Sequence, residues 1–250
     1  MSRQSSSAQS SSTGETIRIV IHALIIALVI RTFLFQPFSI PSGSMKSTLL
    51  IGDYLFVSKY SYGYSRFSFP FGPPLFSGRV LASVPERGDV VVFKLPRDNS
   101  TDYIKRVIGL PGDKIQVIGG IVHINGQPVK RERIGDYSET DGNGGEVTVP
   151  RYRETLPNGK TYTVLDLVDN GYADNTQEYV VPEGHFFMMG DNRDNSTDSR
   201  FLNMVGYVPF ENLVGKAQVI FLSLNDDDRF WEFWKWPHSI RWGRLFTGIE

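Results

Sequence analysis

Two serines separated by one glycine lie in the segment "SIPSGSM", residues 39–45 of this 250-residue chain. They are Ser42 and Ser44, and such small polar residues are typical either of a plain flexible loop or of a nucleophilic centre. A hydroxyl becomes an effective nucleophile only when a neighbouring base accepts its proton. The chain has no cysteine, so thiol catalysis, disulfides and cysteine-ligated zinc are excluded. The base must therefore be a histidine, a lysine or a carboxylate elsewhere in the sequence.

Two later segments are rich in such groups. The segment "DYIKRVIGLPGD" (102–113) carries Lys105, and "MGDNRDNSTDSR" (189–200) carries several carboxylates. Each has an ordinary structural interpretation, the first as a strand with a solvated face that runs into a turn, the second as a surface loop. An EF-hand calcium loop is excluded for 189–200, because the glycine of its sharp turn and the closing glutamate are missing.

The four histidines leave one alternative base. The sequence has no G-x-S-x-G, G-x-x-x-x-G-K-[ST] or H-E-x-x-H motif. His22 lies in a hydrophobic run, His238 in an aromatic tail, and His123 alternates with isoleucines in an expected strand. His185 precedes "FFMMGD" and leaves a Ser-His hydrolase open. A serine paired with a lysine is the other chemistry that these segments support.

The serine turn follows the most hydrophobic run of the chain, "IRIVIHALIIALVIRTFLF" at 17–35. As a helix this run spans about 28 Å, close to the ~30 Å hydrocarbon core of a bilayer. The alternative is a cleavable signal peptide, because the uninterrupted apolar core Ile19–Ile30 is short. No alanine-type cleavage site follows it, which favours an uncleaved anchor. The polar residues 1–16 are expected to form a disordered tail. The flanking charges do not settle the orientation.

Residues 36–250 are expected to form a mainly β catalytic domain. Short β-branched and aromatic runs alternate with Gly, Pro and Asn, as in an antiparallel barrel or sandwich. Asn125-Gly126 and Asn158-Gly159 are typical of tight hairpin turns. The polar residues 126–178 are expected to form an inserted β lobe. A net charge of −1 gives no indication of a nucleic-acid partner.

Together these features closely resemble bacterial type I signal peptidases, membrane-bound serine proteases that remove signal peptides from exported proteins. The resemblance covers about 36–113 and 184–220 and is carried, in order, by "SIPSGSM", "RGDVVVF", "YIKRVIGLPGD" and "MGDNRDNSTDSR". It implies that Ser44 is the nucleophile and Lys105 the general base. It also implies that Ser196 orients the lysine amine through a hydrogen bond and that Ser42 donates its hydroxyl to an oxyanion hole. Positions that shape the site are matched by Asp191, Asp198 and Arg200.

The resemblance further implies preprotein substrates with small side chains at the first and third residues before the cut. It implies a single-pass protein of the bacterial inner membrane with its catalytic domain on the trans (periplasmic) side, and no metal or cofactor. One departure is Ser47, where the family usually has proline; after Lys46, it predicts a less rigid turn. An anchored β domain that binds envelope proteins without catalysis is the alternative from a different class.

The chemistry of a lysine base sets a physical requirement. An ordinary lysine with a pKa near 10.4 is neutral in only about one molecule in 2,500 at pH 7. Its pKa must fall by roughly three units, which burial among apolar strand residues such as Ile104 and Val107 would achieve. Arg106 would add to this only if it lay nearby, and strand alternation points it the other way.

All four tryptophans of the chain lie in the C-terminal tail, residues 229–250, interleaved with three arginines and one lysine. Tryptophan favours the headgroup level of a bilayer, so we expect this tail to seat the domain on the membrane, together with the aromatic-proline loop 64–76. The alternative is that the tryptophans pack on the β core and close it.

Overall fold

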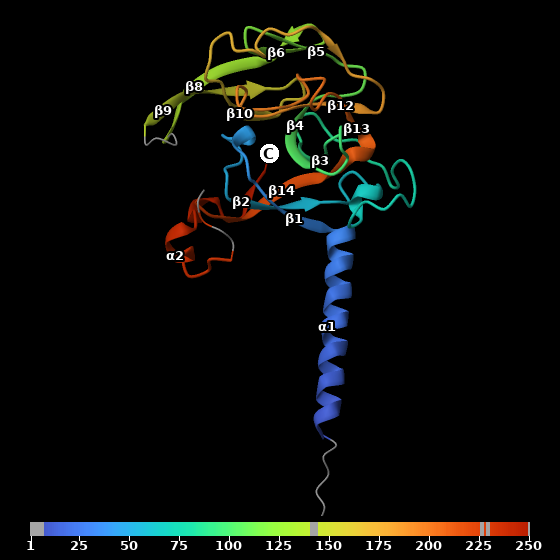
Figure 1. The fold of residues 1–250 in the computed structure, drawn as a ribbon. Coiled ribbons are helices and arrows are strands. Elements are labelled where there is room, and N and C mark those ends of the chain that lie inside the picture. The colour runs from blue at the N-terminus through green and yellow to red at the C-terminus, as the bar shows by residue number, and fades with distance from the viewer. Residues whose placement is uncertain (1–7, 141–144, 226–227, 229–230, 250) are drawn as a thin grey trace, which may run out of the picture.

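The computed structural model describes residues 8–140, 145–225, 228 and 231–249. A long helix, α1 (Ala8–Phe33), projects from a β domain that contains most of the remaining chain (Figure 1). Residues 8–16 are therefore helical, which corrects the expected disordered tail over 1–16. Once a stable apolar helix exists, each added residue gains a backbone hydrogen bond at little cost, so the helix extends into the polar segment. Residues 1–7 lie outside the described part.

The apolar part of α1, Thr13–Phe33, is long and apolar enough to cross a membrane and is almost entirely exposed. Its 21 residues span about 32 Å. The helix ends two residues before the expected boundary, because Phe35 begins β1 (Phe35–Ser39) and pairs with Ser58. Pro37 favours this change, since it has no amide hydrogen and disfavours helical geometry in Gln36.

One curled sheet positions the serine turn and the lysine. Its strands lie in the order β1-β2-β14-β3-β4-β12-β13, and every pairing among them is antiparallel. A short β15 (Thr247–Gly248) adds to β14. The expected mainly β, antiparallel fold is thereby confirmed. The bounds are β2 (Asp53–Ser58), β3 (Val90–Lys94), β4 (Asp102–Gly109), β12 (His185–Met189), β13 (Val208–Pro209) and β14 (Leu213–Ser223).

Two smaller sheets lie at the end of the domain away from α1 (Figure 1). One has the order β10-β9-β8 and the other β11-β5-β6-β7. The second includes strands that precede residue 126, so the β lobe begins earlier in the chain than the expected insertion over 126–178. The bounds are β5 (Lys114–Ile118), β6 (Ile121–Ile124), β7 (Gln127–Pro128), β8 (Lys130–Thr140), β9 (Glu146–Thr155), β10 (Thr161–Leu165) and β11 (Tyr179–Val180).

The two Asn-Gly sites both lie between paired strands. Asn125 and Gly126 have φ values of 54° and 78° between β6 and β7, as a type I′ turn requires. Gly159 has φ 83° in the connection between β9 and β10. Asparagine and glycine tolerate this left-handed backbone region better than other residues, which is why the sequence pattern located both turns.

The lobe shares a hydrophobic core with the main sheet. Ile108 and Phe187 of β4 and β12 are fully buried in one cluster with Ile115, Val122 and Val164 of the lobe. Because apolar side chains from all three sheets exclude water together, the lobe is held firmly against the back of β4. A second cluster contains Met45, which anchors the serine turn next to β2 and β14.

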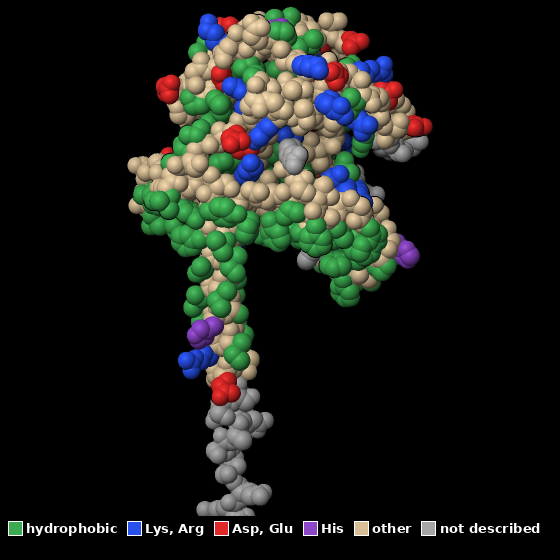
Figure 2. Space-filling view, turned by 180° about the vertical axis from the view of Figure 1, so that it is seen from behind, with side chains coloured by type: hydrophobic (Ala, Val, Ile, Leu, Met, Phe, Trp, Pro, Cys, Tyr) green, Lys and Arg blue, Asp and Glu red, His purple; other side chains and the backbone are tan. Residues whose placement is uncertain are grey.

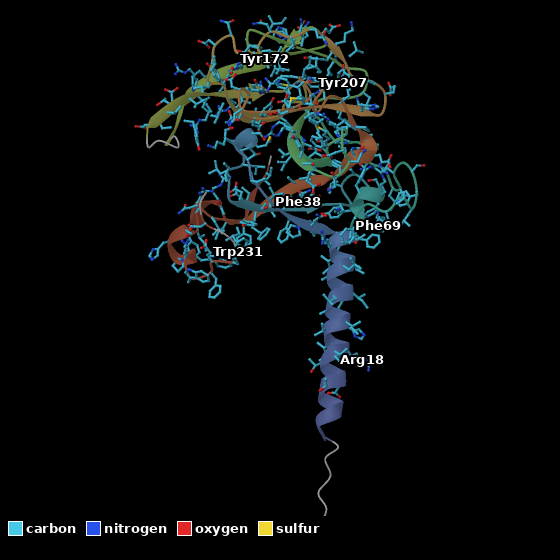
Figure 3. All side chains as sticks on the ribbon, in the orientation of Figure 1. Arg18, Phe38, Phe69, Tyr172, Tyr207 and Trp231 are labelled. Atoms are coloured by element: carbon cyan, nitrogen blue, oxygen red, sulfur yellow. The ribbon has the colours of Figure 1, made fainter. Side chains whose placement is uncertain are left out.

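The exposed apolar surface gathers where α1 leaves the domain. Figure 2 shows hydrophobic side chains across this face, and Figure 3 places Trp231 and Phe69 on either side of the helix. Trp231, Phe233 and Trp234 are each more than 60% exposed, so these tail residues do not close the core. Arg229 and Phe230 of the tail lie outside the described residues. The remaining short elements are η1 (Gly43–Met45), η2 (Arg66–Ser68), η3 (Phe210–Asn212), α2 (Trp236–Ser239) and η4 (Trp242–Arg244).

Candidate active site

The serine turn and the lysine segment meet. Ser44 lies in η1, and the Nζ of Lys105, from the middle of β4, donates a hydrogen bond to its Oγ at 2.6 Å. A second bond runs from Nζ to the carbonyl of Ile104 at 3.0 Å. Both side chains are more than 90% buried. A hydroxyl and an amine this close are in position for direct proton transfer.

The environment of Lys105 favours the neutral amine. Burial lowers its pKa from 10.5 to about 8, although the nearby carboxylates of Asp198 and Asp191 oppose this change. The Arg200 guanidinium lowers the pKa further. At pH 7 about a tenth of the molecules then carry a neutral amine, which is several-hundred-fold more than for a lysine in water.

The serine turn is fixed by the 189–200 loop. Asn192 makes two hydrogen bonds to the turn. Its side-chain amide donates to the carbonyl of Gly43 at 3.0 Å, and its backbone amide donates to the carbonyl of Ser44 at 3.1 Å. Gly190 is required beside it, since a Cβ there would lie 2.2 Å from the Oγ of Ser196 and 2.5 Å from the Ser44 carbonyl. The loop therefore holds both residues of the turn by their backbone.

Ser196 differs from expectation in its partner. Its hydroxyl donates to Oδ2 of Asp198 at 2.8 Å, and the described residues show no hydrogen bond between Ser196 and the Lys105 amine. The reason is that Asp198 is a fully buried carboxylate, and its oxygens need hydrogen-bond donors to compensate for the loss of water. These donors are the amide of Gly190, the hydroxyl of Ser196 and the guanidinium of Arg200. Burial alone would raise the pKa of Asp198, but the ion pair and hydrogen bonds hold it below its ordinary value.

Asp191 forms a buried ion pair on the opposite face of β4. Both of its oxygens accept from Arg106, at 2.9 Å and 2.7 Å, and Thr48 donates to Oδ2 at 2.6 Å. Arg106 therefore faces away from Lys105, as strand alternation predicts, but it is fully buried beneath the lobe. Because Thr48 follows the serine turn, this pair connects β4, the turn and the loop. Apart from strand alternation, no sequence pattern predicted this ion pair.

The lobe also holds the turn. Ser47 has φ 88°, and its hydroxyl donates to the carbonyl of Thr163 in β10 at 2.7 Å, while the Thr163 hydroxyl donates back to it at 3.0 Å. Proline cannot adopt this positive φ. In this chain, hydrogen bonds to β10 hold the turn at the position where the family usually has a proline ring. Arg193 forms a second lobe contact, a buried bidentate pair with Glu154 of β9. Sequence reasoning missed both contacts.

A cleft of about 390 Å³ opens in front of Ser44 and Lys105. Its walls are the segment 38–44, which contains Ser42, and the start of β4, residues 102–105. β1 pairs with β2 alone, and β4 pairs with β12 only from Arg106 onward, so both walls present strand edges without a sheet partner in the described chain. An extended peptide can therefore pair with both edges at once.

His185 lies outside this cleft. It begins β12, and its ring is hydrogen-bonded to the carbonyl of Glu183 at 2.9 Å. Because no residue that lines the cleft is a histidine, the geometry gives no support to a Ser-His pair. Of the predicted site residues, Ser42, Ser44 and Lys105 line the cleft, and those behind it are Asp191, Ser196, Asp198 and Arg200.

Comparison with known proteins identifies the relatives of this chain. The family model described as signal peptidase, peptidase S26, matches residues 13–222. Signal peptidase I of Rickettsia typhi is 46% identical over 241 residues, which cover 90% of this chain and 89% of that protein. Signal peptidase I of Rickettsia akari is 44% identical over 243 residues, covering 90% and 88%. A crystal structure of a signal peptidase I from Enterococcus faecalis V583 matches with 25% identity and a TM-score of 0.33, over 54% of this chain and 97% of that one.

Proposed function

Because this chain belongs to the signal peptidase family, peptidase S26, and is therefore a hydrolase, we propose that it cleaves signal peptides with Ser44 as nucleophile and Lys105 as general base. The observation that supports this assignment most directly is the 2.6 Å hydrogen bond between Lys105 Nζ and Ser44 Oγ. Burial of Lys105 supplies the second requirement, a lowered pKa of about 8.

The reaction proceeds in two halves. Neutral Lys105 accepts the hydroxyl proton while Ser44 Oγ forms a bond to the scissile carbonyl carbon. When the tetrahedral intermediate collapses, the C–N bond breaks and the ammonium of Lys105 gives its proton to the leaving amine. A water molecule then attacks the acyl-enzyme, with Lys105 again as base. The bond from Oγ to the acyl carbon breaks, and Oγ regains a proton from Lys105.

Ser42 and Ser196 support this chemistry from two sides. The Ser42 side chain makes no capping hydrogen bond with η1 and lines the cleft, so its hydroxyl is available to the oxyanion beside the Ser44 amide. Loss of one such donor costs about 3 kcal/mol of transition-state stabilisation in other serine proteases. Ser196, packed against Gly190 next to Ser44, acts on the lysine amine indirectly, because its hydroxyl holds Asp198, whose carboxylate interacts electrostatically with Lys105.

The substrate is a preprotein bound as an extended strand between β4 and the segment before Ser44. Main-chain hydrogen bonds to the two open edges supply affinity, and side-chain pockets supply specificity. The cleft is walled by apolar groups that include Phe38, Ile40 and Val92. Family membership adds the expectation of small side chains, such as alanine, at the first and third residues before the cut.

The enzyme acts at a membrane that α1 crosses once, with the β domain on the trans side of the bacterial inner membrane. The bilayer is also its partner through exposed apolar side chains such as Phe71, Phe233 and Trp234. Hydrophobic side chains gather on the face from which α1 projects (Figure 2). Substrates are held in the same bilayer by their own hydrophobic segments. A cleft close to the membrane surface therefore meets them where they emerge.

The experiment is incubation of the detergent-solubilised protein with a preprotein. Wild type is expected to release the mature protein, and Ser44→Ala and Lys105→Ala are expected to lose activity while their circular dichroism is unchanged. His185→Ala serves as the matched control and should retain activity. Near-wild-type turnover by Lys105→Ala would refute the Ser/Lys assignment, and loss of turnover in His185→Ala alone would favour a histidine base.

A further inference from the structure

A second cavity lies beside the end of α1. It has a volume of about 240 Å³ and is lined by Arg31 of the last helical turn, Gln36, Lys94 of β3, Asp102 of β4 and the loop from Phe67 to Gly72. Phe38 and Asp102 also line the cleft in front of Ser44, so the two cavities adjoin. Figure 3 shows Phe69 next to the end of α1 that enters the domain.

The charge of this cavity is positive. Its charged lining residues are Arg31, Lys94 and Asp102, which sum to +1. Lys94 is ion-paired with Asp102 at 3.0 Å, whereas the side chain of Arg31 makes no ion pair or hydrogen bond with any described residue. An exposed guanidinium with all its donors available is suited to a planar or tetrahedral oxyanion.

A third cation lies behind the wall. Lys59 is 1% exposed, and within the described part of the chain its Nζ donates to the carbonyls of Phe67 and Ser68, at 3.4 Å and 3.3 Å. Burial lowers its pKa to about 8, and although Asp102 opposes this, repulsion from Arg31 and Lys94 lowers it further. The three cations are therefore close enough to act on one another, and an anion in the cavity would relieve their repulsion.

The position of the cavity near the end of the apolar span indicates that the anion is a lipid headgroup. Arg31 is two residues from the end of the apolar span Thr13–Phe33, at the level where long cationic side chains meet lipid headgroups. Phe71 of the lining loop is completely exposed, as is suited to contact with acyl chains. The volume is below the roughly 300 Å³ of the smallest drug-sized sites, which is suited to one headgroup.

We propose that this cavity binds the phosphate of an anionic membrane phospholipid, with Arg31 and Lys94 as its cationic ligands. The proposal rests on the proposed crossing of the membrane by α1. A lipid held here would fix the height of the adjoining substrate cleft above the bilayer, because Phe38 and Asp102 belong to both cavities.

The test measures lipid retention by the full-length chain in detergent micelles, with native mass spectrometry after addition of phosphatidylglycerol or phosphatidylcholine. Wild type should retain phosphatidylglycerol in preference. Arg31→Gln and Lys94→Gln should each weaken retention about fivefold, the effect of removing one cation near a headgroup. Asp102→Asn should strengthen it, since it removes the only carboxylate of the cavity lining. Arg97→Gln is the matched control, because this exposed neighbour in sequence does not line the cavity, and it should change nothing.

Four outcomes would overturn the proposal. These are equal retention by all variants, equal retention of the two lipids, displacement of the lipid by millimolar inorganic phosphate, and a raised KM of Arg31→Gln for a soluble peptide in lipid-free micelles. The third would indicate a site for free phosphate, and the fourth a subsite for an anionic substrate. Flotation of the same protein with vesicles in alkaline carbonate tests the anchor separately. A chain that floats but shows no variant effect refutes the lipid site alone.

Discussion

Replacement of Lys105 by methionine should stabilise the protein at neutral pH. The buried amine has a pKa of about 8 in the folded state and 10.5 as its ordinary value. Below pH 8 both states are protonated, and the folded state carries the cost of a buried ammonium, about 3 kcal/mol by the difference between these values. Between pH 8 and 10.5 the unfolded state binds more protons than the folded state, so wild-type stability rises with pH until that cost disappears.

Methionine fills a similar volume without a charge, so Lys105→Met avoids this cost at every pH. At pH 7 its free energy of unfolding should exceed that of wild type by up to about 3 kcal/mol, which is a Tm increase of roughly 6–12 °C for a domain of this size. The assay is thermal unfolding of the full-length chain in detergent micelles, followed by circular dichroism at pH 7 and above pH 10. Lys114→Met, at an exposed position in β5, is the control and should leave Tm unchanged. A lower Tm for Lys105→Met at pH 7, or the same shift at both pH values, would refute the assignment of a strained buried ammonium.

Three further predictions concern the surroundings of the site. Ser196→Ala should lower kcat at least about tenfold with little change in KM, because the hydroxyl acts on the base through Asp198; a change confined to KM would place Ser196 in substrate binding. Asp191→Ala should destabilise the protein by about 3–5 kcal/mol, since it leaves Arg106 buried without a counter-charge. Glu132→Ala breaks an exposed pair with Lys130 and should have a much smaller effect. Equal effects of the two substitutions in urea unfolding would contradict this account. Replacing Trp231, Phe233 and Trp234 with serine in a chain without α1 should abolish liposome binding and leave Tm unchanged, and unchanged binding would exclude seating by the tail. Substitution is preferable to truncation here, because Arg244 of the tail is ion-paired with the buried Asp53.

The local features of the fold could be predicted from the sequence. Alternation of apolar residues marked the strands, Asn125-Gly126 marked a hairpin, and the apolar run marked α1. These patterns depend on residues that are close in the sequence, so they can be recognised without knowledge of the tertiary contacts. The predicted start of α1 at residue 17 was wrong. Extension of the helix through residues 8–16 depends on the stable helix that follows and not on the polar composition of these residues.

The supports of the candidate site could not be predicted in the same way. Arg106 and Asp191 are 85 residues apart, and Asn192 is 149 residues from Gly43. Strand alternation predicted that Arg106 faces away from Lys105. It could not predict that this face is buried, because the burial depends on the lobe that covers it. Likewise, the composition of 189–200 was typical of a surface loop, and only the tertiary structure places Asp198 and Asn192 against the serine turn.

The most direct test of the central claim is the pH dependence of kcat/KM for preprotein cleavage, which reports the pKa of the essential base in the free enzyme. With neutral Lys105 as that base, kcat/KM should rise about tenfold per pH unit from pH 6, bend near pH 8 and stay level above about pH 9. An activity maximum at about pH 4–5, as expected for a carboxylate base in place of an amine, would contradict the account.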